Sequence, residues 1–259
     1  MQNQEQHRPL TAEREGRILE LLRPATVLGV ADLAAALGVS DATVRRDLQA
    51  MHERGLLQRV RGGATLQQPW RTEPLFQDKE SRQSEAKERI AARALACIAD
   101  HDTIYLDGGS TLLMLARLLE ARRGLTIVTN SLMAAATLMT QPHRLILVGG
   151  EFRALSRTLV GPLTASVIQG VHVQKAFMGT IGFTLEDGMS TTDPNEAFTK
   201  EQVLRRANQV FLLVDSSKLG VSSFSRSGAL EDIDTLITDS IGAEFKEQLE
   251  QRGVEVLTA

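Results

Sequence analysis

Apolar residues near the start of the chain recur at helical spacing in two short runs, one on each side of a glycine. Gly38 supplies the left-handed backbone conformation that often ends a helix, and Ser40 is a suitable N-cap for the next helix. Each run predicts a helix with one apolar face. The apolar positions are Val30, Leu33, Ala34 and Leu37 in the first run, and Val44, Leu48 and Met51 in the second.

The second of these helices carries polar residues on the side opposite its apolar face. Two short helices joined by a glycine-containing turn are the layout of a helix-turn-helix, whose second helix lies in the major groove of DNA. On this pattern alone, an ordinary helical hairpin with a solvated face remains the alternative. The residues predicted to face DNA from this segment are Ser40, Thr43, Arg45, Arg46 and Gln49.

A short β-hairpin is predicted directly after these helices. Residues 57–66, LQRVRGGATL, have strand character on both sides of Gly62–Gly63, where we expect the turn. Arg59 on the first strand and Arg61 near the tip are placed to contact phosphates beside the groove. With a preceding helix over 13–22, the order of elements predicts a winged helix-turn-helix domain over residues 11–66.

The second part of the chain alternates between strand and helix patterns. This alternation predicts a mostly parallel sheet with helices on its faces, so the fold class is α/β with a separate N-terminal winged domain. Predicted strands are 103–107, 125–130, 144–150, 175–179, 210–215, 235–238 and 254–257, and predicted helices are 85–99, 112–122, 132–140, 162–169, 195–208 and 243–252. The domain is expected to span residues 85–259.

Residues 67–84 separate the two predicted domains. This segment contains two prolines and few periodic apolar positions, which is typical of a linker. Three apolar side chains in it, Trp70, Leu75 and Phe76, predict that the linker docks in part against one of the domains.

Charge and composition narrow the class of protein. The chain of 259 residues has a net charge of −3, yet residues 42–63 hold five arginines against Asp47 and Glu53. A small basic face on an acidic body suits a protein that grips DNA with one domain. The single cysteine, Cys97, lies in an alanine-rich helical run and predicts a small core residue in a reducing compartment. The sequence contains no apolar run long enough for a membrane span and no signal-peptide core, so we expect a cytoplasmic protein.

Three predicted strands end in turns suited to an anion. Glycines let backbone N–H groups approach an oxyanion, hydroxyls add donors, and helix N-termini favour negative charge. Any one turn could be an ordinary capped connection, but three at one sheet edge favour an anion site. The residues are Asp107, Gly108, Gly109, Ser110 and Thr111 after the first strand, Thr129, Asn130 and Ser131 after the second, and Gly149 and Gly150 after the third.

Two further polar clusters follow later strands. Asp193, Glu196 and Lys200 open a predicted helix, where they could equally be a cap and a surface ion pair. Asp215 and Lys218 directly follow a buried strand, where the lysine is placed to neutralise a phosphate. The alternative for Lys218 is a solvated loop residue.

The sequence resembles the DeoR family of bacterial transcriptional regulators. The resemblance is carried by VSDATVRRDL in the predicted DNA-reading helix, by GLLQRVRGGA in the wing and by the elements of the second domain, and it covers the chain from about Glu13. It implies a sensor domain with the fold of ribose-5-phosphate isomerase that binds a phosphorylated sugar, and an effector that weakens the hold on operator DNA. The family's phosphate loop would correspond to 107–111, with Gly-Gly-Ser-Thr where Gly-Thr-Thr is commoner. Its TNS, GG, Glu-x-x-x-Lys and DSSK elements would match 129–131, 149–150, 196–200 and 215–218.

An isomerase fused to a DNA-binding domain is the rival hypothesis. Such an enzyme needs a carboxylate to move a proton, and Glu196 with Lys200 are candidates. Enzymes resembling this fold carry Asp-Gly-Ala-Asp after the corresponding strand, whereas residues 179–182 here are Gly-Thr-Ile-Gly. A sensor acting by protein contacts alone is disfavoured by the wing arginines. We therefore expect a regulator that represses an operon of carbohydrate metabolism, with no catalytic residue, metal or cofactor. Its expected partners are operator DNA, a phosphorylated sugar and further copies of itself.

Overall fold

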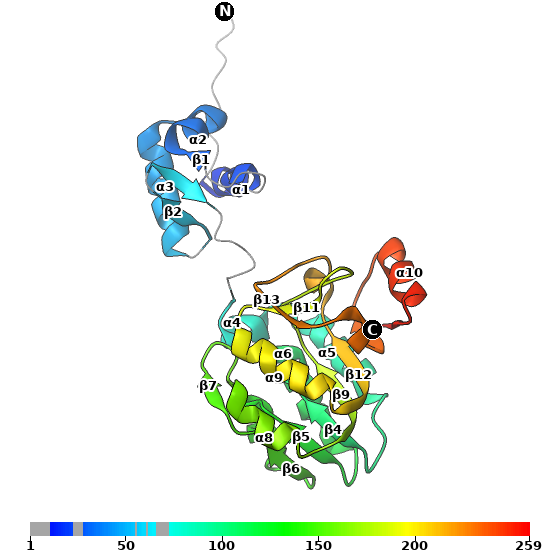
Figure 1. The fold of residues 1–259 in the computed structure, drawn as a ribbon. Coiled ribbons are helices and arrows are strands. Elements are labelled where there is room, and N and C mark those ends of the chain that lie inside the picture. The colour runs from blue at the N-terminus through cyan, green and yellow to red at the C-terminus, as the bar shows by residue number, and fades with distance from the viewer. Residues whose placement is uncertain (1–10, 23–27, 55, 61, 66–72) are drawn as a thin grey trace, which may run out of the picture. The chain divides into compact units, whose positions relative to one another are not determined.

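The structure is a computed structural model that describes residues 11–22, 28–54, 56–60, 62–65 and 73–259. The chain divides into two compact units, residues 1–72 and 73–259 (Figure 1). Each unit has its own hydrophobic core, so each is described by itself. None of the helices in the described ranges combines the length and the apolar character needed to cross a bilayer.

The first unit is a small helical bundle beside a three-stranded antiparallel sheet. Its core is formed by apolar residues that include Ile18, Leu33, Leu48 and Met51, all with no solvent exposure. The two predicted apolar faces are therefore confirmed. The elements are α1 (Thr11–Leu22), β1 (Leu28–Gly29), α2 (Val30–Leu37), α3 (Asp41–Glu53), β2 (Gln58–Val60) and β3 (Gly63–Thr65).

The turn between α2 and α3 has the predicted chemistry. Gly38 ends α2 with φ of 65°, in the left-handed region that glycine adopts at little cost. Ser40 caps α3, because its side chain accepts a hydrogen bond from the backbone N–H of Thr43. Inside the bundle, Arg14 of α1 forms an ion pair with the buried Asp47 of α3 at 2.9 Å, which fixes the orientation of α3.

The wing differs from the prediction in its turn. Val60 pairs with Gly63, so the hairpin loop precedes Gly63 and is not Gly62–Gly63 as predicted. Gly63 belongs to β3, which also pairs with β1, a strand that the sequence pattern did not predict. A Cβ at Gly63 would lie 2.1 Å from the carbonyl oxygen of Leu28, so glycine is required there by close strand pairing rather than by a turn.

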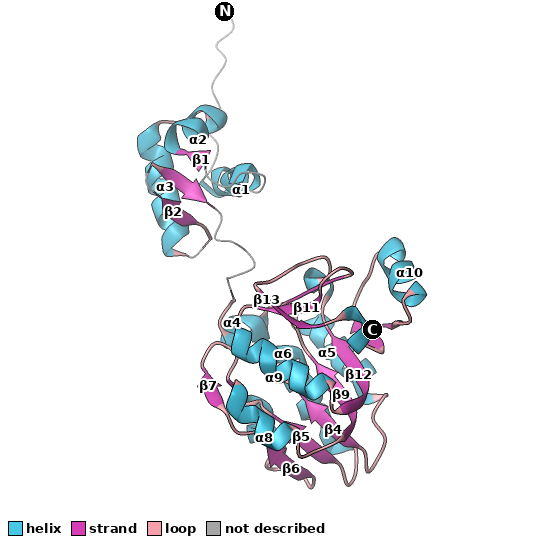
Figure 2. Ribbon diagram, in the orientation of Figure 1, coloured by secondary structure: helices cyan, strands magenta, loops and turns pink. Residues whose placement is uncertain are grey.

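The second unit is built on a parallel sheet of seven strands in the order β15-β14-β12-β9-β4-β5-β6 (Figure 2). All its neighbouring strands pair in parallel, as predicted for the domain. The strands are β4 (Thr103–Leu106), β5 (Thr126–Thr129), β6 (Arg144–Leu147), β9 (Val173–Met178), β12 (Ala207–Leu213), β14 (Thr235–Thr238) and β15 (Glu255–Thr258). The chain extends the sheet from β4 through β6 in one direction and from β9 through β15 in the other. The point of reversal lies between β4 and β9.

Helices cover both faces of this sheet (Figure 2). Along β4, Ile104 and Leu106 pack into the core of one face and Tyr105 into the core of the other, as strand alternation requires. One core includes residues of α5 (Ser84–Leu95), α6 (Ser110–Leu118) and α7 (Leu132–Leu138). The other includes residues of α8 (Ala165–Ile168), α9 (Pro194–Leu204) and α10 (Ala243–Gln251).

Two small antiparallel sheets in the second unit were not predicted. One is a hairpin of β7 (Glu151–Arg153) and β8 (Thr158–Val160), and the other contains β10 (Gly182–Thr184), β11 (Gly188–Thr191) and β13 (Ser225–Gly228). The predicted helix over 195–208 was too long, because residues from Ala207 onward pair with β9 as part of β12. Strand pairing therefore overrides the local helical pattern at that end.

The predicted linker over 67–84 was also too long. Residues from Glu73 onward belong to the second unit and include α4 (Phe76–Ser81). The predicted docking is confirmed for Phe76, which is buried, whereas Leu75 is 56% exposed and Trp70 lies outside the described residues. Burial of Phe76 and the start of α5 at Ser84 explain why this segment folds with the sheet.

Candidate DNA-binding surface and effector pocket

Helix α3 presents two arginines to solvent. Arg45 and Arg46 are both exposed, on the side of the helix away from its buried residues. Thr43 is half-buried, and its hydroxyl lies 2.9 Å from that of Ser40, so these two residues serve the start of the helix as well as its outer face. The two arginines therefore form the most accessible cationic part of α3.

The wing is tied to this helix through polar side chains. The guanidinium of Arg59 on β2 donates to the side-chain oxygen of Gln49 at 2.5 Å, and Gln49 donates to Glu53 at 2.7 Å. These contacts hold an exposed arginine of the wing beside the polar face of α3. Arg61, also predicted to contact DNA, lies outside the described residues.

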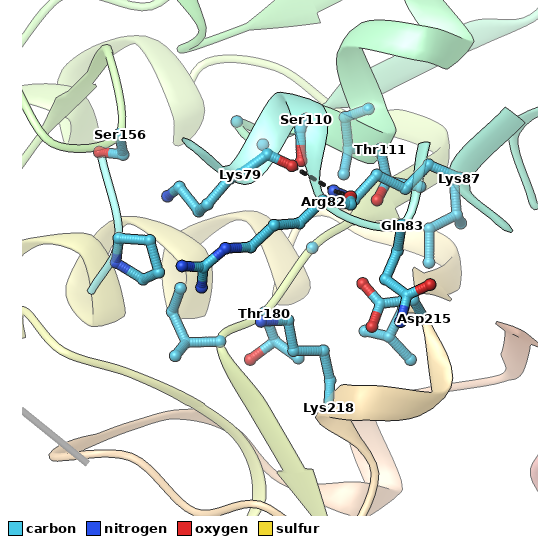
Figure 3. A pocket seen from close by; sticks show the side chains of 18 of the residues that line it. Lys79, Arg82, Gln83, Lys87, Ser110, Thr111, Ser156, Thr180, Asp215 and Lys218 are labelled. Atoms are coloured by element: carbon cyan, nitrogen blue, oxygen red, sulfur yellow. Dashed lines mark hydrogen bonds between the residues drawn. The ribbon is translucent and has the colours of Figure 1, made fainter. Parts of the chain in front are cut away.

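A pocket of about 350 Å³ opens in the second unit (Figure 3). Residues that follow β4, β9 and β12 line it, so it lies at the carboxyl ends of these parallel strands. This includes the point between β4 and β9 where the strand order reverses, the usual ligand site of an open α/β sheet. Predicted site residues that line the pocket are Gly108, Gly109, Ser110, Thr111, Glu196, Lys200, Asp215 and Lys218.

The turn after β4 forms the part of the wall best suited to an anion. Gly109 has φ of 135°, which favours glycine, and it is the N-cap of α6, so backbone N–H groups of the first turn are free of helical partners. Ser110 and Thr111 add hydroxyls beside them. A Cβ on Gly108 would lie 2.1 Å from Cγ2 of Thr158, which shows that the β7–β8 hairpin packs closely against this turn.

The turn after β12 contributes a cation and a carboxylate. Asp215 is buried, and its carboxylate accepts a hydrogen bond from the backbone N–H of Ser217 at 3.1 Å. This contact shapes a short turn that places Lys218 at the pocket. Among the described residues, Lys218 has no ion pair, so its charge is available to a ligand.

A further part of the pocket wall comes from a segment in which the sequence analysis predicted no site residue. Lys79, Arg82, Gln83 and Lys87, from α4, α5 and the turn between them, all line the pocket (Figure 3). Lys87 is buried and donates hydrogen bonds to the backbone carbonyls of Lys79 and Arg82, so it holds the turn in place. Burial lowers the pKa of Lys87. The repeated basic residues at 79, 82 and 87 were the available sequence signal, but the two prolines had suggested a linker.

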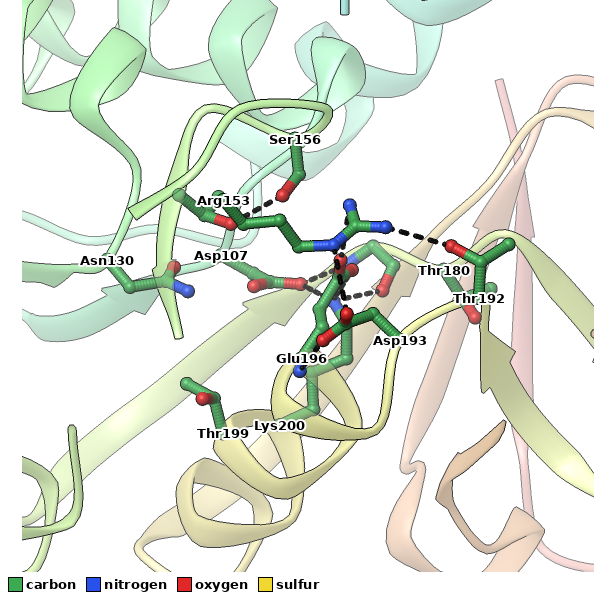
Figure 4. Close-up of polar contacts among 12 residues, drawn as sticks. Asp107, Asn130, Arg153, Ser156, Thr180, Thr192, Asp193, Glu196, Thr199 and Lys200 are labelled. Atoms are coloured by element: carbon green, nitrogen blue, oxygen red, sulfur yellow. Dashed lines mark hydrogen bonds and ion pairs between the residues drawn. The ribbon is translucent and has the colours of Figure 1, made fainter. Parts of the chain in front are cut away.

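Charged side chains of the pocket wall and its surroundings form a buried network (Figure 4). Lys200 of α9 forms an ion pair with Asp107 and donates to the carbonyl of Gly179 at 2.9 Å. Asp107 also accepts a hydrogen bond from the backbone N–H of Gly179 at 3.1 Å, so it joins the ends of β4 and β9. Burial acts to lower the pKa of Lys200, but Asp107 and Glu196 raise it overall.

The network continues to the first residue of the unit. Glu196 lies 3.7 Å from Lys200 and 3.3 Å from Arg153 of the hairpin. Burial raises the pKa of Glu196. Glu73 has a side chain that is 1% exposed and pairs with Lys79 and Arg153, each at 2.6 Å. Burial acts to raise the pKa of Glu73, but Arg153, Lys79 and the hydroxyl of Thr192 lower it to about 2.

The remaining predicted residues are not brought to the pocket. Thr129 donates to the carbonyl of Leu106, Ser131 caps α7 and Asp193 caps α9. Asn130 donates to a backbone carbonyl of β8. Strands β5 and β6 lie on the side of β4 away from β9, which also explains the absence from the lining of Gly149 and Gly150. Asp107 contacts the site through Lys200 rather than by lining it.

Two family models match the sequence. Residues 14–69 match the DeoR-like helix-turn-helix domain, and residues 82–240 match the DeoR C terminal sensor domain. The two matches correspond to the two units of the structure and include the exposed arginines of α3 and the pocket wall from Arg82 to Lys218.

Curated relatives are similar over nearly their whole length. The chain is 36% identical over 249 residues to the HTH-type transcriptional regulator GlpR of Haloferax volcanii, an alignment that covers 96% of this chain and 98% of the relative. It is 34% identical over 251 residues to the lactose phosphotransferase system repressor of Staphylococcus epidermidis, with 95% and 98% covered.

Solved structures give a weaker likeness. The ribose 5-phosphate isomerase A of Methanocaldococcus jannaschii aligns with a TM-score of 0.39 and 19% identity, over 52% of this chain and 54% of that chain.

Proposed function

This chain belongs to the DeoR family of DNA-binding transcriptional regulators, and from this premise we propose that a phosphorylated sugar binds its second unit and changes the affinity of the first unit for operator DNA. The observation that carries the proposal is the pocket at the carboxyl ends of β4, β9 and β12. It combines a helix N-terminus, hydroxyl donors and the ammonium of Lys218, which forms no ion pair with any described residue, and together these groups suit a phosphate.

The rest of the pocket suits a hydroxylated ligand. Thr180 and Gln83 line it, as do the carboxylates of Glu73 and Glu196. These groups offer both donors and acceptors to sugar hydroxyls. A cavity of about 350 Å³ lies within the range of small-molecule sites.

We propose that the protein represses an operon of carbohydrate metabolism and that the sugar phosphate releases it from DNA. The Staphylococcus relative, a lactose phosphotransferase system repressor, supports the first part of this proposal. A ligand shifts the equilibrium between DNA-competent and released states only if its affinity for the two states differs. A coupling of about 1–3 kcal/mol would change operator affinity by roughly 5–150-fold.

Catalysis is not part of the proposed function. Glu196 is the pocket carboxylate that an isomerase would use as a base, but here it lies in ion-pair contact with both Arg153 and Lys200. The segment after β9, from Gly179 to Gly182, adds no carboxylate to the site. Regulation therefore accounts for the arrangement better than proton transfer does.

We also propose that the protein acts as a homo-oligomer. A single α3 helix reads few base pairs, and paired half-sites about one helical turn apart are the usual remedy. Light scattering of the full chain, free and bound to DNA, measures this directly. A monomer under both conditions would contradict the proposal.

The test combines calorimetry with DNA binding. A panel of sugar phosphates is titrated into the full-length protein, and each ligand that binds is added to a complex with upstream DNA followed by fluorescence anisotropy. Lys218→Gln should keep DNA affinity and lose the response to ligand. Arg144→Gln, which removes an exposed charge of β6 outside the pocket, should keep both. If no phosphorylated sugar binds the wild-type protein, the proposed function fails.

A further inference from the structure

Arg82 is a pocket residue whose charge has no partner in the part of the chain that the structure describes. It lies in the turn between α4 and α5, is exposed, and its side chain extends across the pocket (Figure 3). Among the described residues, no ion pair or side-chain hydrogen bond is formed by its guanidinium. A planar cation with several donors, left free at the mouth of a cavity, is suited to a phosphate oxygen pair.

The charges that line the pocket do not cancel. Five cationic side chains face three carboxylates, which leaves an excess of two positive charges. The cations are Lys79, Arg82, Lys87, Lys200 and Lys218, and the carboxylates are Glu73, Glu196 and Asp215.

Most of these charges have identifiable partners within the protein. Lys79 pairs with Glu73 at 2.6 Å, and Lys200 lies between Asp107 and Glu196. The buried ammonium of Lys87 donates hydrogen bonds to the backbone carbonyls of Lys79 and Arg82. In the described part of the chain, Arg82 and Lys218 are the two pocket cations whose side chains form neither an ion pair nor a hydrogen bond.

We propose that Arg82 is an anion-binding residue of the effector pocket which, together with Lys218, balances one phosphomonoester dianion. A phosphomonoester carries about −1.5 to −2 charges at neutral pH, which matches two free cations. A second phosphate group would enter without a counter-charge. The ligand class is therefore a monophosphate whose remaining part is uncharged and hydroxylated.

Through Arg82, a bound ligand would contact the turn between α4 and α5. Gln83, next to Arg82, has φ of 53°, a left-handed conformation that costs a non-glycine residue free energy. The strained turn is held by the hydrogen bonds of Lys87 to Lys79 and Arg82. Helix α4 begins three residues after Glu73, the first residue of the second unit. A ligand held by Arg82 would therefore act on the N-terminal segment of this unit.

The inference rests on the proposed function, and inorganic phosphate is the probe that tests it. Thermal unfolding of the full-length protein is followed in sodium phosphate and in sodium chloride of equal ionic strength. A ligand at free concentration c that binds only the folded state adds RT ln(1 + c/Kd) to the free energy of unfolding, and the melting temperature rises accordingly. Phosphate should stabilise the wild-type protein, and Arg82→Gln and Lys218→Gln should each weaken its apparent affinity about tenfold.

Matched variants separate charge from fold. Arg82→Lys keeps the charge and should recover most of the affinity. Arg144→Gln, a loss of charge outside the pocket, should bind phosphate like the wild type. Melting of Arg82→Gln in chloride should equal that of the wild type, because the native side chain makes no hydrogen bond to any described residue that the substitution would remove.

The outcomes are distinct. Weakening by Lys218→Gln but not by Arg82→Gln overturns the role of Arg82 and leaves the proposed function standing. If phosphate does not stabilise the wild-type protein, there is no anion site, and both the role of Arg82 and the proposed function are contradicted. Sodium pyrophosphate should bind no more tightly than phosphate, and tighter binding overturns the balance with a single dianion.

Discussion

The guanidinium of Arg153 donates a hydrogen bond of 2.6 Å to the carboxylate of Glu73, its partner eighty residues earlier in the chain. The same carboxylate accepts hydrogen bonds of 2.6 Å from Lys79 and from the hydroxyl of Thr192. Glu73 therefore joins the first residue of the second unit to α4, to the β7–β8 hairpin and to the segment before α9.

Glu73→Gln should destabilise the second unit by about 2–4 kcal/mol at pH 7, because it removes the buried charge that pairs with two half-buried cations. The pKa of Glu73 in the folded protein is about 2, below its value in the unfolded chain. The stabilisation by its charge is therefore present above about pH 4.5 and is lost as pH falls toward 2. Chemical denaturation at several pH values measures the difference between wild type and variant, which should shrink across that range.

Glu80→Gln is the matched control for this substitution. Glu80 pairs with Arg117 at 2.7 Å, but both side chains are substantially exposed, at 32% and 48%. Such surface pairs contribute about 0–1 kcal/mol. A loss for Glu73→Gln no larger than for Glu80→Gln would show that the buried network does not stabilise the fold.

Replacement of both Arg45 and Arg46 by alanine should abolish tight operator binding. Each arginine that reads a base edge contributes about 1–3 kcal/mol, and each that neutralises a phosphate contributes to the salt dependence. Anisotropy titrations at several salt concentrations give both quantities. Arg89→Ala/Arg123→Ala, which removes two exposed arginines of the second unit, should leave DNA affinity unchanged. If the two double variants bind operator DNA with equal affinity, Arg45 and Arg46 of α3 do not contact the DNA.

Gly108→Ala should weaken effector binding by pushing the β7–β8 hairpin away from the pocket turn. The added methyl group would lie 2.1 Å from Cγ2 of Thr158. Thr158→Ser removes that methyl group and keeps the hydroxyl, which lies 2.7 Å from that of Ser156. Calorimetry should therefore show recovery in Gly108→Ala/Thr158→Ser, and a double variant as weak as the single one would rule out this clash. Gly109→Ala should not be rescued in this way, because its φ of 135° strains any other residue.

Met51→Ala should destabilise the first unit by about 2–5 kcal/mol, because Met51 has no exposure and its truncation leaves a cavity. In a small unit this is a large share of the total stability. Calorimetric scanning should show an earlier transition for the first unit with the second unit unchanged. Met139→Ala, at a side chain that is 72% exposed, should shift neither transition.

Local signals predicted the first unit well. The αL glycine at 38, the cap at Ser40 and the apolar stripes each involve residues only a few positions apart, so sequence spacing determines them. The wing turn was misplaced because the reason for Gly63 is not local. Glycine is required at position 63 because Leu28, in a strand 35 residues earlier, approaches it closely.

The pocket could be predicted only in part, because strand order is not encoded in local pattern. The turns after β4, β5 and β6 look alike in sequence, but β9 inserts beside β4 and moves the reversal point away from β5 and β6. This places Lys218 in the pocket and leaves Ser131 as a helix cap. Arg82 was missed because its segment folds only through long-range contacts, such as those of Glu73.

The positions of Arg82 and Lys218 in the chain have a consequence for synthesis. The first unit is complete in sequence after residue 72, whereas the pocket wall requires β12 and the turn at Lys218. Because domains fold in order as the ribosome releases them, the part of the protein that reads DNA can fold long before a pocket exists. A chain that ends early, by a premature stop codon before β12, would therefore retain the DNA-reading unit without the pocket that we propose binds the effector.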